Sequence, residues 1–242
     1  MSISIIVPAY NEELLIGSTI KAIIHFLILN DIDGEIIIIN DGSDDQTQSI
    51  VERILASNKT KIFLKSINNY KNMGKGYSVR TGMLASSGDI RVFMDADLPY
   101  NLDLLLEIQS RLLNDADVVI GDRNNPQSKL IDIHKLRKIA GRIYSAFVQI
   151  LIKGGITDTQ CGLKGFSAES ALVIFSRGRI NGFGFDVEVL RIAQKYGLSI
   201  SKLPVEMINN RADSRVQLFQ DSLLMLWNLI LIRTNQLFGY YD

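Results

Sequence analysis

Two carboxylates separated by one alanine follow an apolar run near the middle of the chain. Residues 90–94 are Ile, Arg, Val, Phe and Met, and Asp95, Ala96 and Asp97 come next. Such a run predicts a short buried strand, and open α/β sheets bind ligands beyond the carboxyl ends of their strands. Two neighbouring anions there repel each other and lose hydration. Both effects are unfavourable unless a cation or hydrogen-bond donors compensate the charges. Hard oxygen ligands favour Mg²⁺ or Mn²⁺, whereas the simpler alternative is a solvated turn before a helix.

Three further loops carry side chains that could hold a nucleotide. Tyr10 could stack on a base, and Glu12 could meet the polar edge of that base. Asp41 could accept a hydrogen bond from the ring N–H of uracil or guanine, and Lys75, flanked by glycines, could meet phosphate or ribose. Each residue also has an ordinary structural reading, as a surface aromatic, a turn former or a loop residue. Their convergence on one edge of one sheet favours a nucleotide site.

Alternating strand and helix patterns in the first half of the chain must position these residues. Apolar runs predict strands, and apolar residues at helical spacing predict helices. The expected strands are residues 3–7, 35–39, 61–66 and 90–94, and the expected helices are residues 12–29, 45–56 and 76–86. This rhythm predicts the α/β class, with a doubly wound, mostly parallel sheet flanked by helices.

Composition narrows the function classes. The 242 residues include 26 basic and 26 acidic side chains, so net charge gives no reason to expect a nucleic-acid partner. The single cysteine, Cys161, excludes an intramolecular disulfide, suits a reducing compartment and is expected to be packed. No run approaches the roughly 18 apolar residues of a membrane span, and the first residues lack a basic signal-peptide region. We therefore expect a cytoplasmic protein, soluble or peripheral to a membrane.

Seven motifs, taken together, resemble the inverting glycosyltransferases of family 2, and within that family the polyprenyl-phosphate (dolichyl-phosphate) glucosyltransferases and mannosyltransferases. The last two motifs lean towards the glucosyl branch. The motifs are VPAYNEE at 7–13, NDGSDDQT at 40–47, NMGKG at 72–76, DADL at 95–98, GDR at 121–123, DTQCGLKGF at 158–166 and GFGFDVE at 182–188.

This resemblance implies the GT-A fold and a division of the chain. A glycosyltransferase domain would span residues 1–217, with a nucleotide-sugar-binding half at 1–120 and an acceptor-binding half at 121–217. Residues 218–242 would form a separate C-terminal apolar helix.

The resemblance also implies roles for individual residues. Asp95 and Asp97, with Ala96 between them, match the pair that binds ribose and the diphosphate-bound metal. Arg123 matches an arginine that faces the sugar diphosphate or the acceptor phosphate. The other matched positions hold the nucleotide or, for the last two, close over the donor as a basic pair on a late loop: Pro8, Tyr10, Glu12, Ile39, Asp41, Arg211 and Arg215.

The expected mechanism follows from the charge of the leaving group. A metal held by Asp97, together with Arg211 or Arg215, would stabilise the departing diphosphate while the acceptor attacks the opposite face of the sugar. A phosphate-monoester acceptor has a second pKa of about 6, so it needs no base, and Asp158 would then orient other groups. A hydroxyl acceptor would need a general base, and Asp158 would be the first candidate.

A basic segment precedes an apolar helical stretch at residues 143–152. Phe147, Ile150 and Leu151 in that stretch could face a membrane or a partner. We expect the segment to receive the phosphate head of a polyprenyl lipid, whereas a core helix with a solvated basic end is the alternative. The basic residues are Lys129, Lys135, Arg137, Lys138 and Arg142.

Two later stretches leave alternatives open. Asp186 and Glu188 diverge on an expected helix from about 182 to 196, and either could line the acceptor side of a cleft. The apolar run at 222–232 could pack on the domain, lie at a membrane interface with Trp227 and the Tyr240–Tyr241 end near headgroups, or form a dimer seam.

The sequence thus predicts an Mg²⁺- or Mn²⁺-dependent inverting transferase that moves a hexose, with UDP-glucose favoured, onto a polyprenyl phosphate at the cytoplasmic face of a membrane. GDP-mannose as donor, or a glycan hydroxyl as acceptor, is the alternative within the class. A sugar-phosphate nucleotidyltransferase would open with a Gly-rich, Arg-containing loop, which the residues after Pro8 do not supply. A non-catalytic nucleotide-sugar-binding module is the remaining alternative, and a homodimer or a membrane partner is compatible with each reading.

Overall fold

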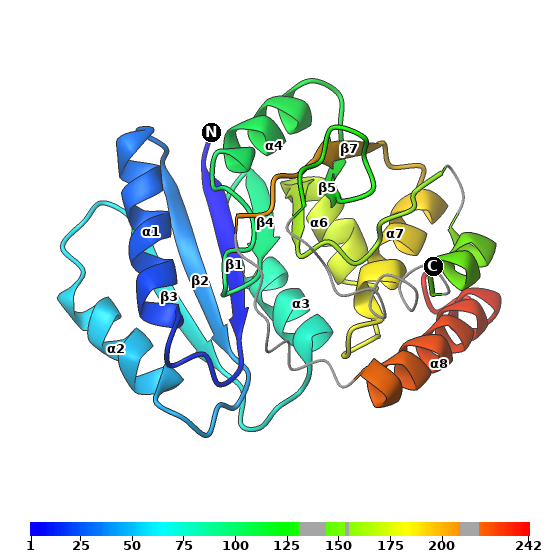
Figure 1. Ribbon diagram of the computed structural model, residues 1–242, viewed down its shortest axis with the longest axis horizontal. Helices are drawn as coiled ribbons and strands as arrows, with labels where there is room; N and C mark the ends of the chain where they lie inside the picture. Colours follow the sequence, from blue (N-terminus) through cyan, green and yellow to red (C-terminus); the bar gives the residue numbers. More distant parts are fainter. Residues whose placement is uncertain (131–143, 153–154, 209–217) are drawn as a thin grey trace.

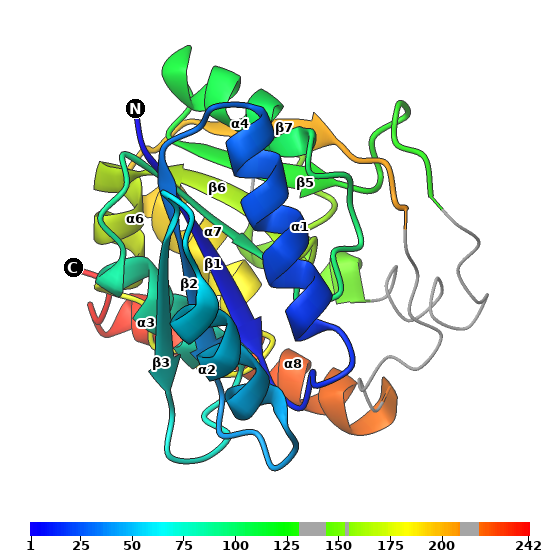
Figure 2. The same cartoon turned by 90° about the vertical axis from the view of Figure 1, so that its left-hand side faces the viewer.

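The computed structural model describes residues 1–130, 144–152, 155–208 and 218–242, and the side chains of the last range from residue 224. Within these residues a seven-stranded sheet has the order β3-β2-β1-β4-β6-β5-β7, with helices on both faces (Figures 1 and 2). The strands are β1 (Ile3–Ala9), β2 (Gly34–Asn40), β3 (Phe63–Asn68), β4 (Ile90–Met94), β5 (Val118–Asp122), β6 (Leu163–Ser167) and β7 (Ile200–Pro204).

The sheet is parallel from β3 to β4 and mixed beyond it. β1 pairs in parallel with both β2 and β4, and β2 pairs in parallel with β3. β6 runs antiparallel to both of its neighbours, β4 and β5, and β7 is again parallel to β5. The predicted doubly wound, mostly parallel α/β sheet is therefore confirmed, with one reversed strand in its second half.

Helices cover the two faces of the sheet in separate sets. α1, α2 and α4 contribute to one hydrophobic core, whereas α3, α6, α7 and α8 contribute to the other. Figure 2 shows α1 and α6 on opposite sides of the sheet. The helices are α1 (Ile16–Leu29), α2 (Thr47–Ser57), α3 (Lys75–Ala85), α4 (Leu104–Leu113), α6 (Ala168–Phe175), α7 (Phe185–Lys195) and α8 (Leu218–Leu237), and residues 144–151 are also helical.

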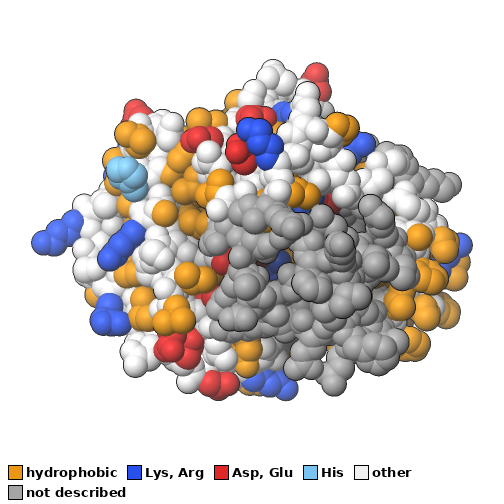
Figure 3. Space-filling model, in the orientation of Figure 1, with side chains coloured by type: hydrophobic (Ala, Val, Ile, Leu, Met, Phe, Trp, Pro, Cys, Tyr) orange, Lys and Arg blue, Asp and Glu red, His pale blue; other side chains and the backbone are white. Residues whose placement is uncertain are grey.

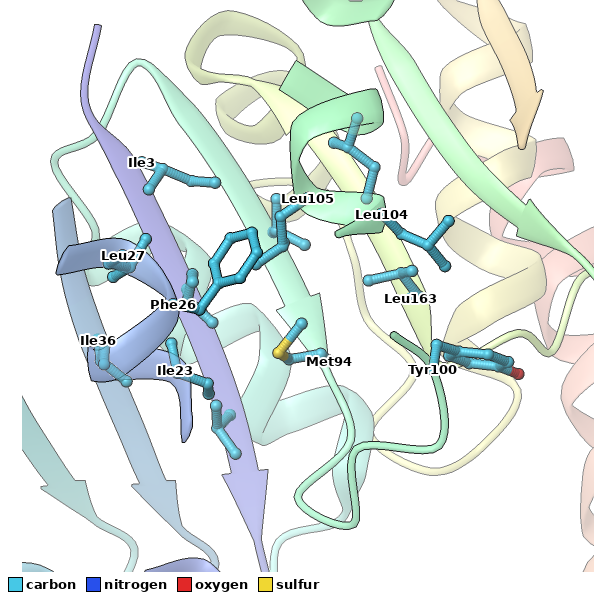
Figure 4. Close-up of a cluster of buried hydrophobic side chains, with 14 of the residues drawn as sticks. Ile3, Ile23, Phe26, Leu27, Ile36, Met94, Tyr100, Leu104, Leu105 and Leu163 are labelled. Carbon is cyan, nitrogen blue, oxygen red and sulfur yellow. The ribbon is translucent and has the colours of Figure 1, made fainter. Parts of the chain in front are cut away.

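The continuous apolar run of β2 follows from this two-sided burial. Ile36 and Ile38 belong to the first core, and Ile37 and Ile39 belong to the second. Successive strand residues point to opposite faces, so a strand covered on both sides needs an apolar residue at every position. Figure 4 shows the first core, in which the ring of Phe26 of α1 points toward Leu105 of α4.

Element boundaries differ from the prediction where turns replace regular structure. The first helix begins at Ile16 rather than at residue 12, because residues 12–15 form a turn in which Glu12 O accepts the N–H of Leu15 and Ile16. The third strand begins at Phe63 rather than at residue 61, because Phe63 is the first of its residues to pair with β2, opposite Glu35.

The C-terminal helix is longer than the apolar run that predicted it. α8 spans Leu218–Leu237, and its Leu229 and Ile232 are buried in the second core. Tyr241 is also buried, and its hydroxyl donates to Glu188 Oε1 at 2.7 Å, so of the Tyr240–Tyr241 end only Tyr240 is exposed, as the membrane-interface alternative requires. Among the helices of the described residues, none has both the length and the apolar character needed to cross a membrane. The domain boundary at 217–218 stays a prediction.

Candidate functional site

The predicted nucleotide loops meet at one edge of the sheet. β1, β2 and β4 are parallel neighbours, so the loops after Ala9, Asn40 and Met94 leave the sheet on the same side. Asp41 N donates to Ala9 O at 2.8 Å, which joins the first two of these loops directly. Tyr10 and Glu12 are half-buried there, and Pro8 pairs with Ile39 across the strands. Because the Ile39 side chain is fully buried in the core, only its backbone can serve a nucleotide.

Lys75 and Asp95 form an ion pair at this edge. Lys75 Nζ lies 2.5 Å from Asp95 Oδ1, and the two side chains are 20% and 31% exposed. Burial lowers the pKa of Lys75, but the charges of Asp95, Asp186 and Asp97 outweigh it and raise that pKa overall. The lysine that the sequence assigned to phosphate or ribose thus contacts the first carboxylate of the pair.

A tight turn presents the two carboxylates. Asp95 O accepts the N–H of Leu98 at 3.1 Å, and Leu98 has a positive φ of 43°. Thr19 Oγ1, buried in α1, donates to Ala96 O at 2.5 Å and so fixes the turn to the first core. Gly162 packs against Asp95 so closely that a Cβ there would lie 1.8 Å from Asp95 Oδ2. Sequence reasoning missed Thr19 and Gly162, because each is distant in sequence from the turn that it supports.

The carboxylate pair carries excess negative charge. Burial raises the pKa of Asp97, and the neighbouring charge of Asp95 raises it further. No group of three or more His, Cys, Asp or Glu residues that could enclose a metal occurs in the part of the chain that the structure describes. Two carboxylates with no third protein ligand fit an ion such as Mg²⁺ or Mn²⁺ that takes its other ligands from water and substrate phosphates. The donor set therefore fits the predicted metal, which Asp95 and Asp97 would hold.

Asp41 organises the loop that leads to Lys75. Its Oδ1 accepts from Asn69 Nδ2 at 2.6 Å and from Met73 N at 2.9 Å, and its Oδ2 accepts from Gly74 N at 2.9 Å. Asp41 is buried at the predicted edge, so its carboxylate holds the entrance of α3 in addition to any contact with a base.

Arg123 and Asp158 form a second ion pair, in which the carboxylate is the more buried partner. Asp158 accepts from Arg123 Nη2 at 2.7 Å, from Nε at 2.8 Å and from the backbone N–H at 2.8 Å. Burial raises the pKa of Asp158, but the Arg123 hydrogen bonds and charge lower it to below its usual value overall. A carboxylate held in this way orients the guanidinium and is poorly suited to accept a proton.

Close packing connects the end of β5 with the carboxylate turn. A Cβ on Gly121, near the end of β5, would lie 2.4 Å from Cys161 Sγ. Gly162, which follows Cys161 in the chain, lies against Asp95. Cys161 is fully buried at this junction, as the sequence predicted. Arg123 therefore stands on the same edge of the sheet as the carboxylate pair.

Asp186 and Glu188 do not line the acceptor side of a cleft, so that expectation is wrong. Asp186 is buried in an ion pair with Lys164, and Lys164 Nζ also donates to Cys161 O at 2.7 Å. Burial raises the pKa of Asp186, and the charge of Lys164 opposes this rise. Glu188 accepts from Ile180 N at 2.9 Å and from the hydroxyl of Tyr241. Both carboxylates therefore make structural contacts in the protein interior.

Most of the predicted basic residues lie outside the residues that the structure describes. The described segment 155–208 ends beside the carboxylate turn, because Ile208 N donates to Pro99 O at 2.9 Å. Lys129 is exposed and lies 3.5 Å from Glu206. Outside the described residues lie Lys135, Arg137, Lys138, Arg142, Arg211 and Arg215.

The chain is similar to known proteins over most of its length. Residues 4–175 match the family model described as Glycosyl transferase family 2. The chain is 35% identical to a dolichyl-phosphate beta-glucosyltransferase of Dictyostelium discoideum, over 99% of this chain and 76% of that protein. It is 28% identical to the human protein of that name, over 98% of this chain and 76% of the relative. A Trichomonas vaginalis relative of the same name is 35% identical, and the match covers 84% of this chain and 65% of that protein.

Solved structures show the same fold at lower identity. Glucosyl-3-phosphoglycerate synthase from Mycobacterium tuberculosis, in complex with UDP, superposes with a TM-score of 0.70 at 23% identity, over 96% of this chain and 79% of that one. Mannosyl-3-phosphoglycerate synthase from Rubrobacter xylanophilus gives a TM-score of 0.69 at 16% identity, over 99% and 74% of the two chains. The predicted GT-A fold is confirmed by these likenesses.

Proposed function

Since this chain belongs to glycosyl transferase family 2 and is a glycosyltransferase of the hexosyltransferase type, we propose that it transfers glucose from UDP-glucose to a polyprenyl phosphate. The observation that carries the proposal is the turn of Asp95 and Asp97, paired with Lys75 at the edge where the predicted nucleotide loops converge. Relatives named dolichyl-phosphate beta-glucosyltransferase support the glucosyl donor and the lipid acceptor. Solved GT-A structures with UDP and Mg²⁺ or Mn²⁺ support the nucleotide and the metal.

The donor end of the site follows from its charges. A divalent ion bound by Asp97 and Asp95 would neutralise charge on the departing diphosphate. The half-buried Tyr10 and the backbone at Pro8 and Ile39 lie where a base and ribose would bind beyond the strand ends. Asp41 holds the 72–74 loop in place, so that Lys75 enters the site from the first turn of α3.

The acceptor end favours a phosphate nucleophile over a hydroxyl. Arg123 presents a guanidinium whose orientation Asp158 fixes, which suits the recognition of a phosphate group. The same three hydrogen bonds occupy Asp158, the first candidate for a general base. A phosphate monoester needs no base, because it is already largely ionised at neutral pH.

A surface on α8 supports contact with a membrane. Trp227 is 56% exposed on this helix, and Leu224 and Ile230, one turn before and after it, are also exposed. Phe147 and Ile150 are exposed on the neighbouring helical residues 144–151, and hydrophobic side chains gather in this region in Figure 3. Arg233 adds positive charge, which anionic headgroups attract. We propose a peripheral site at the cytoplasmic face.

The test is a panel of radiolabelled donors with a short polyprenyl phosphate, with and without EDTA. We expect UDP-glucose to give a glucosyl lipid, EDTA to abolish the product, and Asp97→Asn to do the same without loss of folding. Mannose transfer from GDP-mannose would instead support the same-class alternative. Lack of transfer from every donor would contradict the proposal and favour a binding module.

A further inference from the structure

An ammonium group lies against a carboxylate that the proposed function assigns to a metal. Lys75 Nζ is 2.5 Å from Asp95 Oδ1, within the distance of a strong, charge-assisted hydrogen bond. The lysine side chain is only 20% exposed, and it also interacts electrostatically with Asp97 and Asp186. One cation of the protein itself therefore already compensates part of the negative charge at this edge.

The backbone fixes the position of this lysine. Gly74 has a φ of +97°, a conformation that strains residues with a side chain, and a Cβ there would lie 2.5 Å from Asn181 O. A Cβ on Gly76 would lie 2.5 Å from Ile180 O. The first turn of α3 is thus packed directly on the 180–181 backbone, and Tyr77 N donates to Asn181 O at 3.1 Å. Glycines on both sides of Lys75 allow this contact, so its place beside Asp95 is built into the fold.

We propose that Lys75 is an internal counter-cation that competes with the divalent metal for Asp95, so that the metal binds strongly only together with the donor diphosphate. A carboxylate that is paired with an ammonium, as Asp95 is, attracts a divalent ion less strongly than the same carboxylate would without that ammonium. A diphosphate adds negative charge and oxygen ligands, so the positive charges of both the metal and Lys75 can then be balanced at the site. Lys75 acts here through Asp95 and is a positioning residue.

The competition predicts a gain of metal affinity when the lysine charge is removed. Mn²⁺ binding is measured by electron paramagnetic resonance on protein without nucleotide, for the wild type, Lys75→Met and Lys75→Arg. We expect Lys75→Met to bind Mn²⁺ about tenfold more tightly or better, because the competing charge is gone. Lys75→Arg keeps the charge and should bind as the wild type does. Lys71→Met, which removes an exposed lysine of the same loop, is the matched control and should change nothing.

A second measurement uses UDP. Adding UDP should raise the Mn²⁺ affinity of the wild type by a larger factor than that of Lys75→Met, because only the wild type has a competitor to displace. Equal or weaker Mn²⁺ binding by Lys75→Met, or an equal gain in Lys71→Met, would overturn the inference. Lys75→Gln decides the question by the same criteria if the methionine variant does not fold.

The inference rests on the proposed function only for the arrival of the metal with a nucleotide diphosphate. Mn²⁺ binding without nucleotide requires no sugar transfer, so it can fail while the transfer assay succeeds. The reverse outcome, a gain in Mn²⁺ affinity without transfer from any donor, would retain the counter-cation and reject the glucosyltransferase proposal.

Discussion

At the scale of single residues, the Asp158 carboxylate accepts three hydrogen bonds from Arg123. This geometry favours a phosphate nucleophile that needs no base over a hydroxyl acceptor that Asp158 would deprotonate. A buried carboxylate with a lowered pKa stabilises the folded state, because folding favours its charged form. The pair therefore contributes to stability above the pKa of an unfolded aspartate, about 4, and its contribution is lost as pH falls through the lower folded pKa.

Asp158→Asn should reduce the free energy of unfolding by about 3 kcal/mol at neutral pH, because it leaves the Arg123 charge without its partner. The difference from the wild type should shrink as pH falls below about 4, because the aspartate of the unfolded chain takes up a proton there, whereas the folded carboxylate does so only at its lower pKa. Urea unfolding across this pH range measures both effects. Asp44→Asn, which alters an exposed carboxylate, should show neither.

The same variant tests the acceptor. With a phosphate nucleophile, Asp158→Asn should raise the acceptor KM and lower kcat by less than about 100-fold, since no proton transfer is lost. A larger fall in kcat with an unchanged acceptor KM would indicate a general base and a hydroxyl acceptor.

The residues that the sequence could reveal are those that follow strands. Asp41, Lys75 and Asp95 share strand ends or helix starts, and parallel strands bring such positions to one edge. Gly162 and Thr19 were not predictable, because their signal is a contact across 67 and 77 residues, with Asp95 and with Ala96 O respectively. Lys164 and Asp186 were missed as a pair for the same reason, since they lie 22 residues apart.

At the scale of elements, α8 has two different faces. Leu229 and Ile232 pack in the second core, whereas Leu224, Trp227 and Ile230 remain exposed. Of the three roles that the sequence left open, packing on the domain is confirmed, and the membrane interface and the dimer seam stay predictions. One face is packed on the domain, and the other is available to a membrane or to a second protein.

Trp227→Ser combined with Ile230→Ser should lower binding to vesicles that contain anionic lipid, because both side chains would otherwise bury apolar surface at the interface. We expect the partition coefficient, measured by vesicle flotation, to fall by about fivefold or more. Leu29→Ser, at the exposed end of α1 on the opposite face, is the matched control and should bind as the wild type does. Unchanged flotation, with a dimer in sedimentation that only the double variant disrupts, would favour the dimer seam.

The parallel half of the sheet was predictable, but the reversed strand was not. Apolar runs of β1, β2 and β4 alternate with helices, which indicates parallel pairing. β6 lies between β4 and β5 and runs against both, and an apolar run carries no information about direction. Gly162 directly precedes this reversed strand and contacts Asp95, so the unpredicted element supports the predicted carboxylate.

At the scale of the whole molecule, the carboxylate turn joins two hydrophobic cores and two halves of the sheet. Met94 ends β4 in the first core, and the adjacent Phe93 belongs to the second. The predicted donor residues lie on the loops after β1, β2 and β4, whereas Arg123 follows β5 beyond the reversed strand. Donor and acceptor groups can thus meet from two sides of the Asp95–Asp97 turn.

The most direct test of this account is the anomalous scattering of Mn²⁺ in crystals grown with UDP-glucose and a short polyprenyl phosphate. The account predicts one strong peak within coordination distance of Asp97, bridging to the diphosphate, with the base beside Tyr10 and Asp41. A nucleotide bound away from this turn, or a metal on other residues, would contradict it.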